Sequence, residues 1–187
     1  MAGDPPAPTL ALVAAVALEE VAAAYLGPDR ALIKWPNDLL LRTPSDGGAG
    51  PRPSPGYKIA GILLERTGDA VVIGFGVNLA AHPEGLDRPA TSLAAAGVEP
   101  PEPGSFLIDL AESFALWLSR WRGEGLQPVR KRWLERAHSI GTALVAQGAD
   151  GKRIEGLFDG LDESGALRLR LADGSVHVMH AGDVFLI

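Results

Sequence analysis

Three short segments combine charged, amide and glycine residues in ways that could support chemistry. The first, residues 34–38, reads Lys-Trp-Pro-Asn-Asp and follows the apolar run 31–33. Proline disfavours helix at the residue before it and cannot continue a β ladder, so this run should end by presenting Asn37 and Asp38 at a strand terminus. Taken alone, the segment is explained more simply as an Asx-type turn than as a binding site.

The second segment, residues 58–65, reads Lys-Ile-Ala-Gly-Ile-Leu-Leu-Glu. A lysine at the head of an apolar strand can bind a carboxylate or phosphate as a point charge, which is the functional interpretation of Lys58. Gly61 would allow a ligand or another backbone to approach closely. The alternative is a lysine whose stem lies on apolar surface while its ammonium group stays in water.

The third segment, residues 74–78, reads Gly-Phe-Gly-Val-Asn. Because side chains alternate across a strand, Gly74 and Gly76 would leave one face bare, as the floor of a pocket for a flat ligand. Asn78 at the strand end could offer its amide to a phosphate or to metal-bound water. The alternative is that the glycines only let another element pack closely on the strand. The segment is not a Rossmann fingerprint, because no helix is predicted to follow it.

Composition narrows the classes of protein and of site. The chain has 187 residues, a net charge of −6, four histidines and no cysteine, which excludes disulfides, thiolate metal sites and a cysteine nucleophile. The histidines do not cluster, which argues against a zinc site. The densest basic run, residues 130–132 with Arg136, is interpreted as a solvated helix face, so no nucleic-acid footprint is predicted.

Two observations bear on the cellular location. No run reaches the ~18 consecutive apolar residues that a membrane-spanning helix needs. Residues 1–8 carry no positive charge before the apolar stretch, unlike a signal peptide. We therefore expect a cytoplasmic protein without membrane association.

Hydrophobic periodicity and turn residues predict the elements that position these segments. Helices are expected at 9–26, with Thr9 as N-cap and Gly27-Pro28 as the stop, and at 105–121 and 127–137. Strands are expected at 31–34, 57–65 and 70–76, the last two forming a hairpin, and 43–56 is predicted to be a mobile surface loop. Beyond residue 140, alternating runs predict a small all-β unit of SH3-like size with strands at 142–147, 153–161, 166–171 and 175–179.

The order of the three segments, flanked by apolar helices and a terminal β unit, resembles the bacterial biotin protein ligases of the biotin/lipoate ligase superfamily. The resemblance implies an α+β fold in which a mixed or antiparallel sheet packs with helices. Residues 1–138 would be the C-terminal portion of a catalytic domain like that of class II aminoacyl-tRNA synthetases, incomplete at its N-terminus. Residues 139–187 would form an SH3-like barrel.

The resemblance also implies an activity and its partners. Such enzymes use ATP and Mg²⁺ to convert biotin to biotinyl-5′-AMP, and then pass biotin to a lysine of a carboxyl carrier protein of acetyl-CoA carboxylase or another biotin-dependent carboxylase. Two anions must meet in line, so the site needs cations. No helix-turn-helix domain is present, so DNA is not expected as a partner. The oligomeric state is left open, with a homodimer as one alternative.

By position in the matching segments, the resemblance assigns roles to individual residues. Lys58 would bind the biotin carboxylate and later the adenylate, and Asp38 would position or deprotonate the incoming lysine amine or help to hold Mg²⁺. The remaining candidates would surround the ligands: Asn37 and Asn78 at the phosphates or metal shell, Trp35 on the adenine side, and Gly61, Gly74 and Gly76 on the biotin side. No metal ligand is assigned with certainty.

The chain departs from the family pattern in one large respect. The Arg/Gly-rich loop, and the Ser/Thr and Gln residues that family members carry upstream of the first helix, are not in this sequence. A ligase shortened at its N-terminus is the favoured explanation, and a short protein of altered function is the other. Lipoate or octanoate transfer, and non-catalytic binding of biotin or its adenylate, therefore stay as alternatives.

Overall fold

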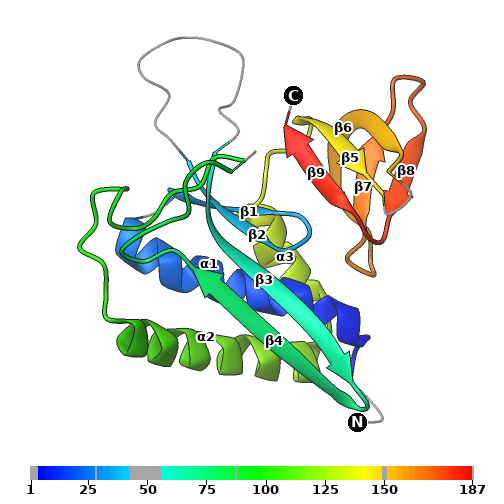
Figure 1. Cartoon of the computed structure of the whole chain (residues 1–187). Helices are drawn as coiled ribbons and strands as arrows, with labels where there is room; N and C mark the ends of the chain where they lie inside the picture. The colour runs from blue at the N-terminus through cyan, green and yellow to red at the C-terminus, as the bar shows by residue number, and fades with distance from the viewer. Residues whose placement is uncertain (1–3, 28, 43–55, 87, 149–150, 187) are drawn as a thin grey trace.

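The computed structural model describes residues 4–27, 29–42, 56–86, 88–148 and 151–186, and its elements form two sheets with three α-helices (Figure 1). The loop predicted at 43–56 lies outside these residues except for Gly56. The expectation of an α+β fold followed by a small β unit is confirmed. The division at residue 138 stays a proposal, because the two sheets are separate but no observation fixes the boundary.

A buried helix forms the centre of the core. The short 3-10 helix η1 (Ala7–Thr9) leads into α1 (Leu10–Leu26), which is apolar on most of its surface and contributes eleven buried residues. By length and composition the segment Ala7–Leu26 could cross a membrane, but 67% of its most apolar window is buried inside the protein. A buried core helix passes the same test, so the segment is weak grounds for a membrane span.

The first sheet carries all three segments singled out in the sequence. Its strands are β1 (Ala31–Lys34), β2 (Asp38–Leu41), β3 (Tyr57–Thr67) and β4 (Ala70–Val77), antiparallel and in the order β1-β2-β3-β4. The two long helices α1 and α2 (Pro103–Glu124) lie together behind the β3–β4 hairpin (Figure 1). Along β4, exposed residues alternate with half-buried ones, so one face of this strand meets the helices and the other meets solvent.

The C-terminal unit is a five-stranded antiparallel sheet in the order β8-β7-β6-β5-β9. Its strands are β5 (Ala143–Gln147), β6 (Arg153–Leu161), β7 (Leu167–Arg170), β8 (Val176–Met179) and β9 (Asp183–Leu186). Among the described residues β8 and β9 do not pair, so the sheet does not close into the expected barrel. We call residues 143–186 the C-terminal module.

The turn between β6 and β7 brings this module against α1. Gly165 has φ +86°, and a Cβ added there would lie 2.7 Å from Cδ1 of Leu12, a buried residue of α1. A side chain at this position would therefore meet both an unfavourable backbone conformation and a packed neighbour.

Four expectations need correction. Thr9 stands at the N-cap position of α1, but its side chain does not cap the helix, because its backbone is helical (φ −70°, ψ −12°) and its hydroxyl donates to the Pro6 carbonyl. The helix predicted to reach 137 is α3 (Gln127–Glu135), since Ala137 instead bridges to Ile33 of β1. The helix predicted at 105–121 extends over both termini, as α2. Strand β9 was not predicted, because the three apolar residues after Asp183 show no alternation with polar ones.

The basic run 130–136 is not a simple solvated face. The Arg132 and Arg136 guanidinium groups lie 3.3 and 3.6 Å from the carboxylate of Glu19, which is completely buried in α1. Burial raises the pKa of Glu19, and the two arginines oppose that shift. Arg130 donates to the Leu161 carbonyl. These arginines therefore tie α3 to α1 and to β6, and of the four basic residues at 130, 131, 132 and 136 only Lys131 is exposed.

His138, just beyond α3, makes stability depend on pH. Burial, with the nearby charges of Arg42 and Lys34, lowers the pKa of its ring to about 4. In the unfolded chain the His138 ring takes up a proton near pH 6.5, whereas in the folded chain it stays neutral until about pH 4. The stability that is present above pH 6.5 is therefore lost as the pH falls toward 4. Between pH 7 and pH 5 this group should cost about 2 kcal/mol. We expect His138→Gln to reduce the loss by that amount in urea unfolding, and equal losses in both proteins would contradict the assignment.

Candidate active site

The β1–β2 hairpin places two opposite charges face to face. Lys34 and Asp38 are register partners across the hairpin, and Lys34 Nζ lies 3.1 Å from Asp38 Oδ2. The intervening turn is fixed to β3 by Asn37, whose Nδ2 donates to the Ile62 carbonyl at 2.7 Å while the Ile62 amide donates to the Asn37 carbonyl at 2.9 Å. The turn is thus part of the sheet edge rather than a free loop.

Asp38 links this hairpin to the second sequence segment. A register shift between Leu39 and Leu40 sets Asp38 opposite Gly61, and Lys58 Nζ lies 2.5 Å from Asp38 Oδ1. The carboxylate is 5% exposed, whereas the Lys58 side chain is 40% exposed. A Cβ on Gly61 would lie 3.0 Å from Lys58 Nζ. The glycine therefore leaves room for the ammonium group, which is anchored by a buried acid and still open to a ligand.

The three strand glycines form one bare patch beside Lys58. Gly61 pairs with Gly76, and Leu63 pairs with Gly74. A Cβ on Gly74 or Gly76 would meet only a carbonyl oxygen, at 3.8 or 3.9 Å, which is ordinary contact. Close packing therefore does not explain these two glycines, and a ligand floor becomes the better interpretation. A cavity of about 490 Å³ lies over the patch and is also lined by Asn37 and Lys58.

A second cavity, of about 210 Å³, is also lined by Lys58. Its walls come from the first sheet, the loop before Thr91 and strand β9, and the lining residues are Lys34, Asp38, Leu40, Gly56, Lys58, Arg88, Pro89, Val184, Phe185 and Leu186. Lys58 lines both cavities. One cation therefore borders two spaces, an arrangement that suits two ligands whose anionic ends must meet.

Residues of the C-terminal module complete the charge cluster. Lys34 Nζ donates to Asp183 Oδ1 at 2.9 Å and to the Val184 carbonyl at 3.1 Å. The Arg88 guanidinium pairs with Asp183 Oδ2 at 2.5 Å and lies over the Phe185 ring. Burial acts to raise the pKa of Asp183, but the hydrogen bonds and charges of Arg88 and Lys34 hold that pKa below its usual value.

Two predicted site residues lie differently from the rest. The Asn78 amide is occupied by protein, donating to the Thr91 carbonyl at 2.9 Å and, at 3.5 Å, to that of Lys58. Trp35 is 4% exposed and lines a separate cavity of about 440 Å³ between the start of α1 and the C-terminal module. The structure therefore brings Asp38, Lys58 and the glycines together with Asn37, but not Trp35.

Sequence reasoning gave no role to three residues of the cluster. Lys34 could have been found, because a tight hairpin through Trp-Pro-Asn sets it opposite Asp38. Arg88 and Asp183 carry no local signal. Asp183 lies 149 positions after Lys34, in a strand that the sequence did not predict.

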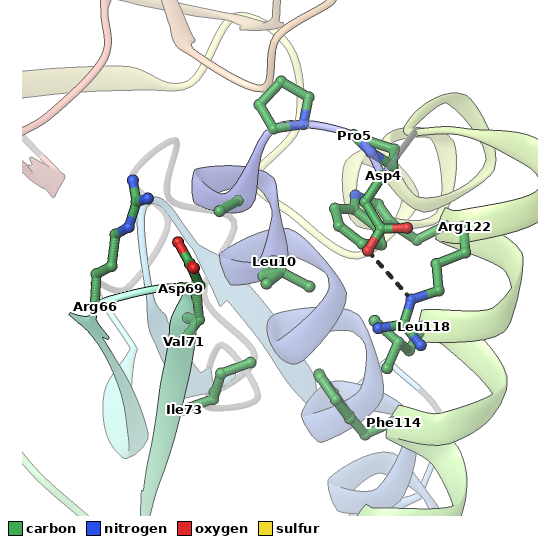
Figure 2. Close-up of a pocket in the computed structure, with 13 residues that line it drawn as sticks. Asp4, Pro5, Leu10, Arg66, Asp69, Val71, Ile73, Phe114, Leu118 and Arg122 are labelled. Atoms are coloured by element: carbon green, nitrogen blue, oxygen red, sulfur yellow. Dashed lines mark ion pairs between the residues drawn. The ribbon is translucent and has the colours of Figure 1, made fainter. Parts of the chain in front are cut away.

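A larger cavity, of about 750 Å³, lies at the far end of the β3–β4 hairpin. Figure 2 shows apolar side chains of α1, α2 and β4 between two groups of charges, Arg66 and Asp69 on the hairpin and the Asp4–Arg122 ion pair opposite. The cavity lacks Lys58 and Asp38, and its volume alone assigns it no chemistry. Among the described residues, no group of three or more His, Asp or Glu side chains could hold a metal ion.

Comparisons with known proteins agree on one family. Residues 143–187 match the model of the biotin protein ligase C-terminal domain. The chain is 37% identical to the biotin–acetyl-CoA-carboxylase ligase of Paracoccus denitrificans, across 94% of this chain and 72% of that protein. It is 31% identical to the bifunctional ligase/repressor BirA of Escherichia coli but spans only 52% of that protein. The apo biotin protein ligase of Aquifex aeolicus, 20% identical, has the same fold, with a TM-score of 0.76 over 97% of this chain and 75% of that one.

The buried position of Asp38 gives a test of the cluster. Asp38→Asn removes one of two carboxylates from a buried lysine ammonium, and we expect it to lower the free energy of unfolding by about 3 kcal/mol. Lys58→Met removes a partly exposed partner and should cost less than about 1 kcal/mol. Denaturant unfolding of the two variants at pH 7 measures the difference. Equal costs would contradict Asp38 as the buried centre of the network.

Proposed function

Since this chain belongs to the biotin protein ligase family, we propose that it activates biotin with ATP and transfers it to a lysine of a carboxyl carrier protein. One observation supports this most directly: Lys58 is held by a buried acid and lines two cavities. The carrier would belong to acetyl-CoA carboxylase or another biotin-dependent carboxylase. Cytoplasmic location, the absence of DNA binding and an oligomeric state up to a homodimer belong to the same proposal.

The proposed chemistry has two balanced steps. A carboxylate oxygen of biotin attacks the α-phosphorus of ATP, and the bond to the β-phosphate breaks, giving biotinyl-5′-AMP and pyrophosphate. The amine of the carrier lysine then attacks the biotinyl carbonyl, AMP leaves, and the amine gives up a proton. Both steps bring negative charge to one point, where a preorganised cation stabilises it without rearrangement.

The residues of the site take these roles in the proposal. Lys58 would hold the biotin carboxylate and then the adenylate, while the patch of Gly61, Gly74 and Gly76 would lie under biotin. Asp38 would receive or orient the carrier amine. Both of its oxygens already contact ammonium groups, so an incoming amine would displace Lys58 rather than Lys34, which is buried.

The phosphate side of the proposal is supported less directly. Asn37 stands beside Lys58 at the glycine cavity, and Asn78 and Trp35 stay assigned to the phosphates and adenine by resemblance. The described residues do not form a metal site by themselves, and the oxygens of Asp38 are occupied. Mg²⁺ would therefore enter on the phosphates of ATP.

Replacing Lys58 tests the proposed activation step. We expect Lys58→Ala to abolish biotin-dependent exchange of pyrophosphate into ATP, because the carboxylate and the phosphate would then meet without their shared cation. Lys131→Ala, on an exposed face of α3, is the matched control and should leave exchange unchanged. Exchange by Lys58→Ala at the rate of the unaltered chain would overturn the assignment. Assays with lipoate and octanoate separate the alternatives, and biotin binding without exchange would indicate a non-catalytic module.

The bare patch allows a test that separates folding from binding. Gly76→Val adds a side chain on the solvent side, where a Cβ meets only the Gly61 carbonyl at 3.9 Å, so the fold should persist. The side chain would occupy the floor of the cavity, and we expect biotin to bind at least about tenfold more weakly by calorimetry. Gly123→Ala, with open space around its Cβ, is the control. Unchanged affinity in Gly76→Val would remove the patch from the biotin site.

A further inference from the structure

We propose that Asp183, in the C-terminal module, is a positioning residue that keeps Asp38 available to Lys58. The expected effect on catalysis rests on the proposed function, whereas the effect on the position of Lys58 rests only on the contacts described above. Asp183 lines neither of the two cavities that Lys58 lines, and it would act on the site through Lys34 and Arg88.

The Lys34 ammonium group depends on the C-terminal module for its hydrogen-bond acceptors. Its ammonium group has three protons and is 6% exposed, so it needs three acceptors from the protein. The structure supplies Asp38 Oδ2 at 3.1 Å, Asp183 Oδ1 at 2.9 Å and the Val184 carbonyl at 3.1 Å. Two of these three acceptors belong to β9. A buried cation in the first sheet is thus satisfied only when the C-terminal module is in place.

Lys34 and Lys58 compete for Asp38. Its two oxygens are divided, Oδ1 to Lys58 and Oδ2 to Lys34. Without the Asp183 carboxylate, Asp38 would be the only carboxylate in contact with Lys34. Lys34 would then bind Asp38 more strongly, because an uncompensated buried charge is costly. Lys58 is 40% exposed and can turn to water, so it would be the cation that yields. Asp183 thereby fixes the position of a lysine that it does not touch.

A second route leads from Asp183 to the same lysine. Arg88, which pairs with the other oxygen of Asp183, directly precedes Pro89. The Lys58 amide donates to the Pro89 carbonyl at 3.0 Å, and the Thr91 amide donates to the Lys58 carbonyl at 2.9 Å. One carboxylate therefore holds Lys58 through a side-chain path and through a backbone path.

A simpler role must be separated from this one. Asp183 could merely fasten the two sheets together, in which case any loss on its replacement would follow stability alone. Asp159 provides a matched control, because its carboxylate pairs with Arg168 at 2.8 Å within the same module and has no contact with Lys34 among those described. Asp183→Glu keeps the charge and should restore what Asp183→Asn removes.

The decisive readout does not need turnover. The chain has four lysines, at 34, 58, 131 and 152, so protein labelled with ¹³C and ¹⁵N in lysine gives one Cε–Nζ signal for each lysine, four in all. We expect Asp183→Asn to move the Lys34 and Lys58 signals and to leave the Lys131 signal in place, while Asp159→Asn moves neither the Lys34 nor the Lys58 signal. A Lys58 signal that stays at its original position in Asp183→Asn would overturn the proposal, as would equal movement in both variants.

The double variant Lys34→Met with Asp183→Asn gives a second test of the side-chain path. It also serves as the test if Asp183→Asn alone does not fold. Removing the buried cation ends the competition, so the Lys58 signal should return toward its original position. A signal that stays displaced would overturn the side-chain path.

Exchange kinetics connect the proposal to the reaction. In Asp183→Asn, the biotin concentration for half-maximal exchange should rise about tenfold to a hundredfold, as misplacement of a binding group predicts, and Asp183→Glu should recover most of it. An unchanged requirement for biotin would overturn the catalytic consequence. Failure of the unaltered chain to catalyse exchange, while Lys58 still responds to Asp183→Asn, would remove the proposed function and support the positioning contact.

Discussion

A lysine ammonium group buried between two sheets is the constraint on which the site depends. Lys34 is taken out of water by the packing of β1 against its neighbours, and a bare buried charge would cost several kcal/mol. The cost is offset by acceptors from strands far apart in the chain, so sheet register, turn geometry and module placement must all be correct together. The net gain in stability from such a cluster is small, and its main effect is to define one arrangement among many.

The same constraint explains why the neighbouring polar residues are so fully engaged. Asn37 and Asn78 use their amides to fix backbone carbonyls around Lys58, at 2.7 and 2.9 Å. Side chains held in this way cannot relax around a ligand, and a preorganised site loses less free energy when the ligand binds. Hydrogen-bonded side chains therefore hold Lys58 in a defined position, and the glycine patch beside it leaves room for a ligand.

Much of the fold could be predicted from sequence because its signals are local. The hairpin of β3 and β4 follows from alternating apolar residues around Gly68-Asp69, and β6 was predicted with its observed bounds because nine residues suffice to show a period. Lys58, Asp38 and the strand glycines were singled out because each stands at a strand end or breaks a strand pattern, but only the resemblance to the biotin protein ligases gave them predicted roles. Asp183 and Arg88 could not be found, because their importance depends on contacts between separate sheets. Trp35 shows a further limit, since its buried place against the C-terminal module depends on packing that no nearby residue indicates.

The glycine at the β6–β7 turn has a consequence for how such proteins can be rearranged. Because Gly165 packs on Leu12 with a positive φ, the C-terminal module meets α1 through a surface shaped for that helix. A module taken from a relative would fit only if it brought a turn of the same shape and an acid in register with Lys34. Recombination at the boundary between the two sheets is therefore restricted, and the two halves should be inherited as a pair rather than as exchangeable cassettes.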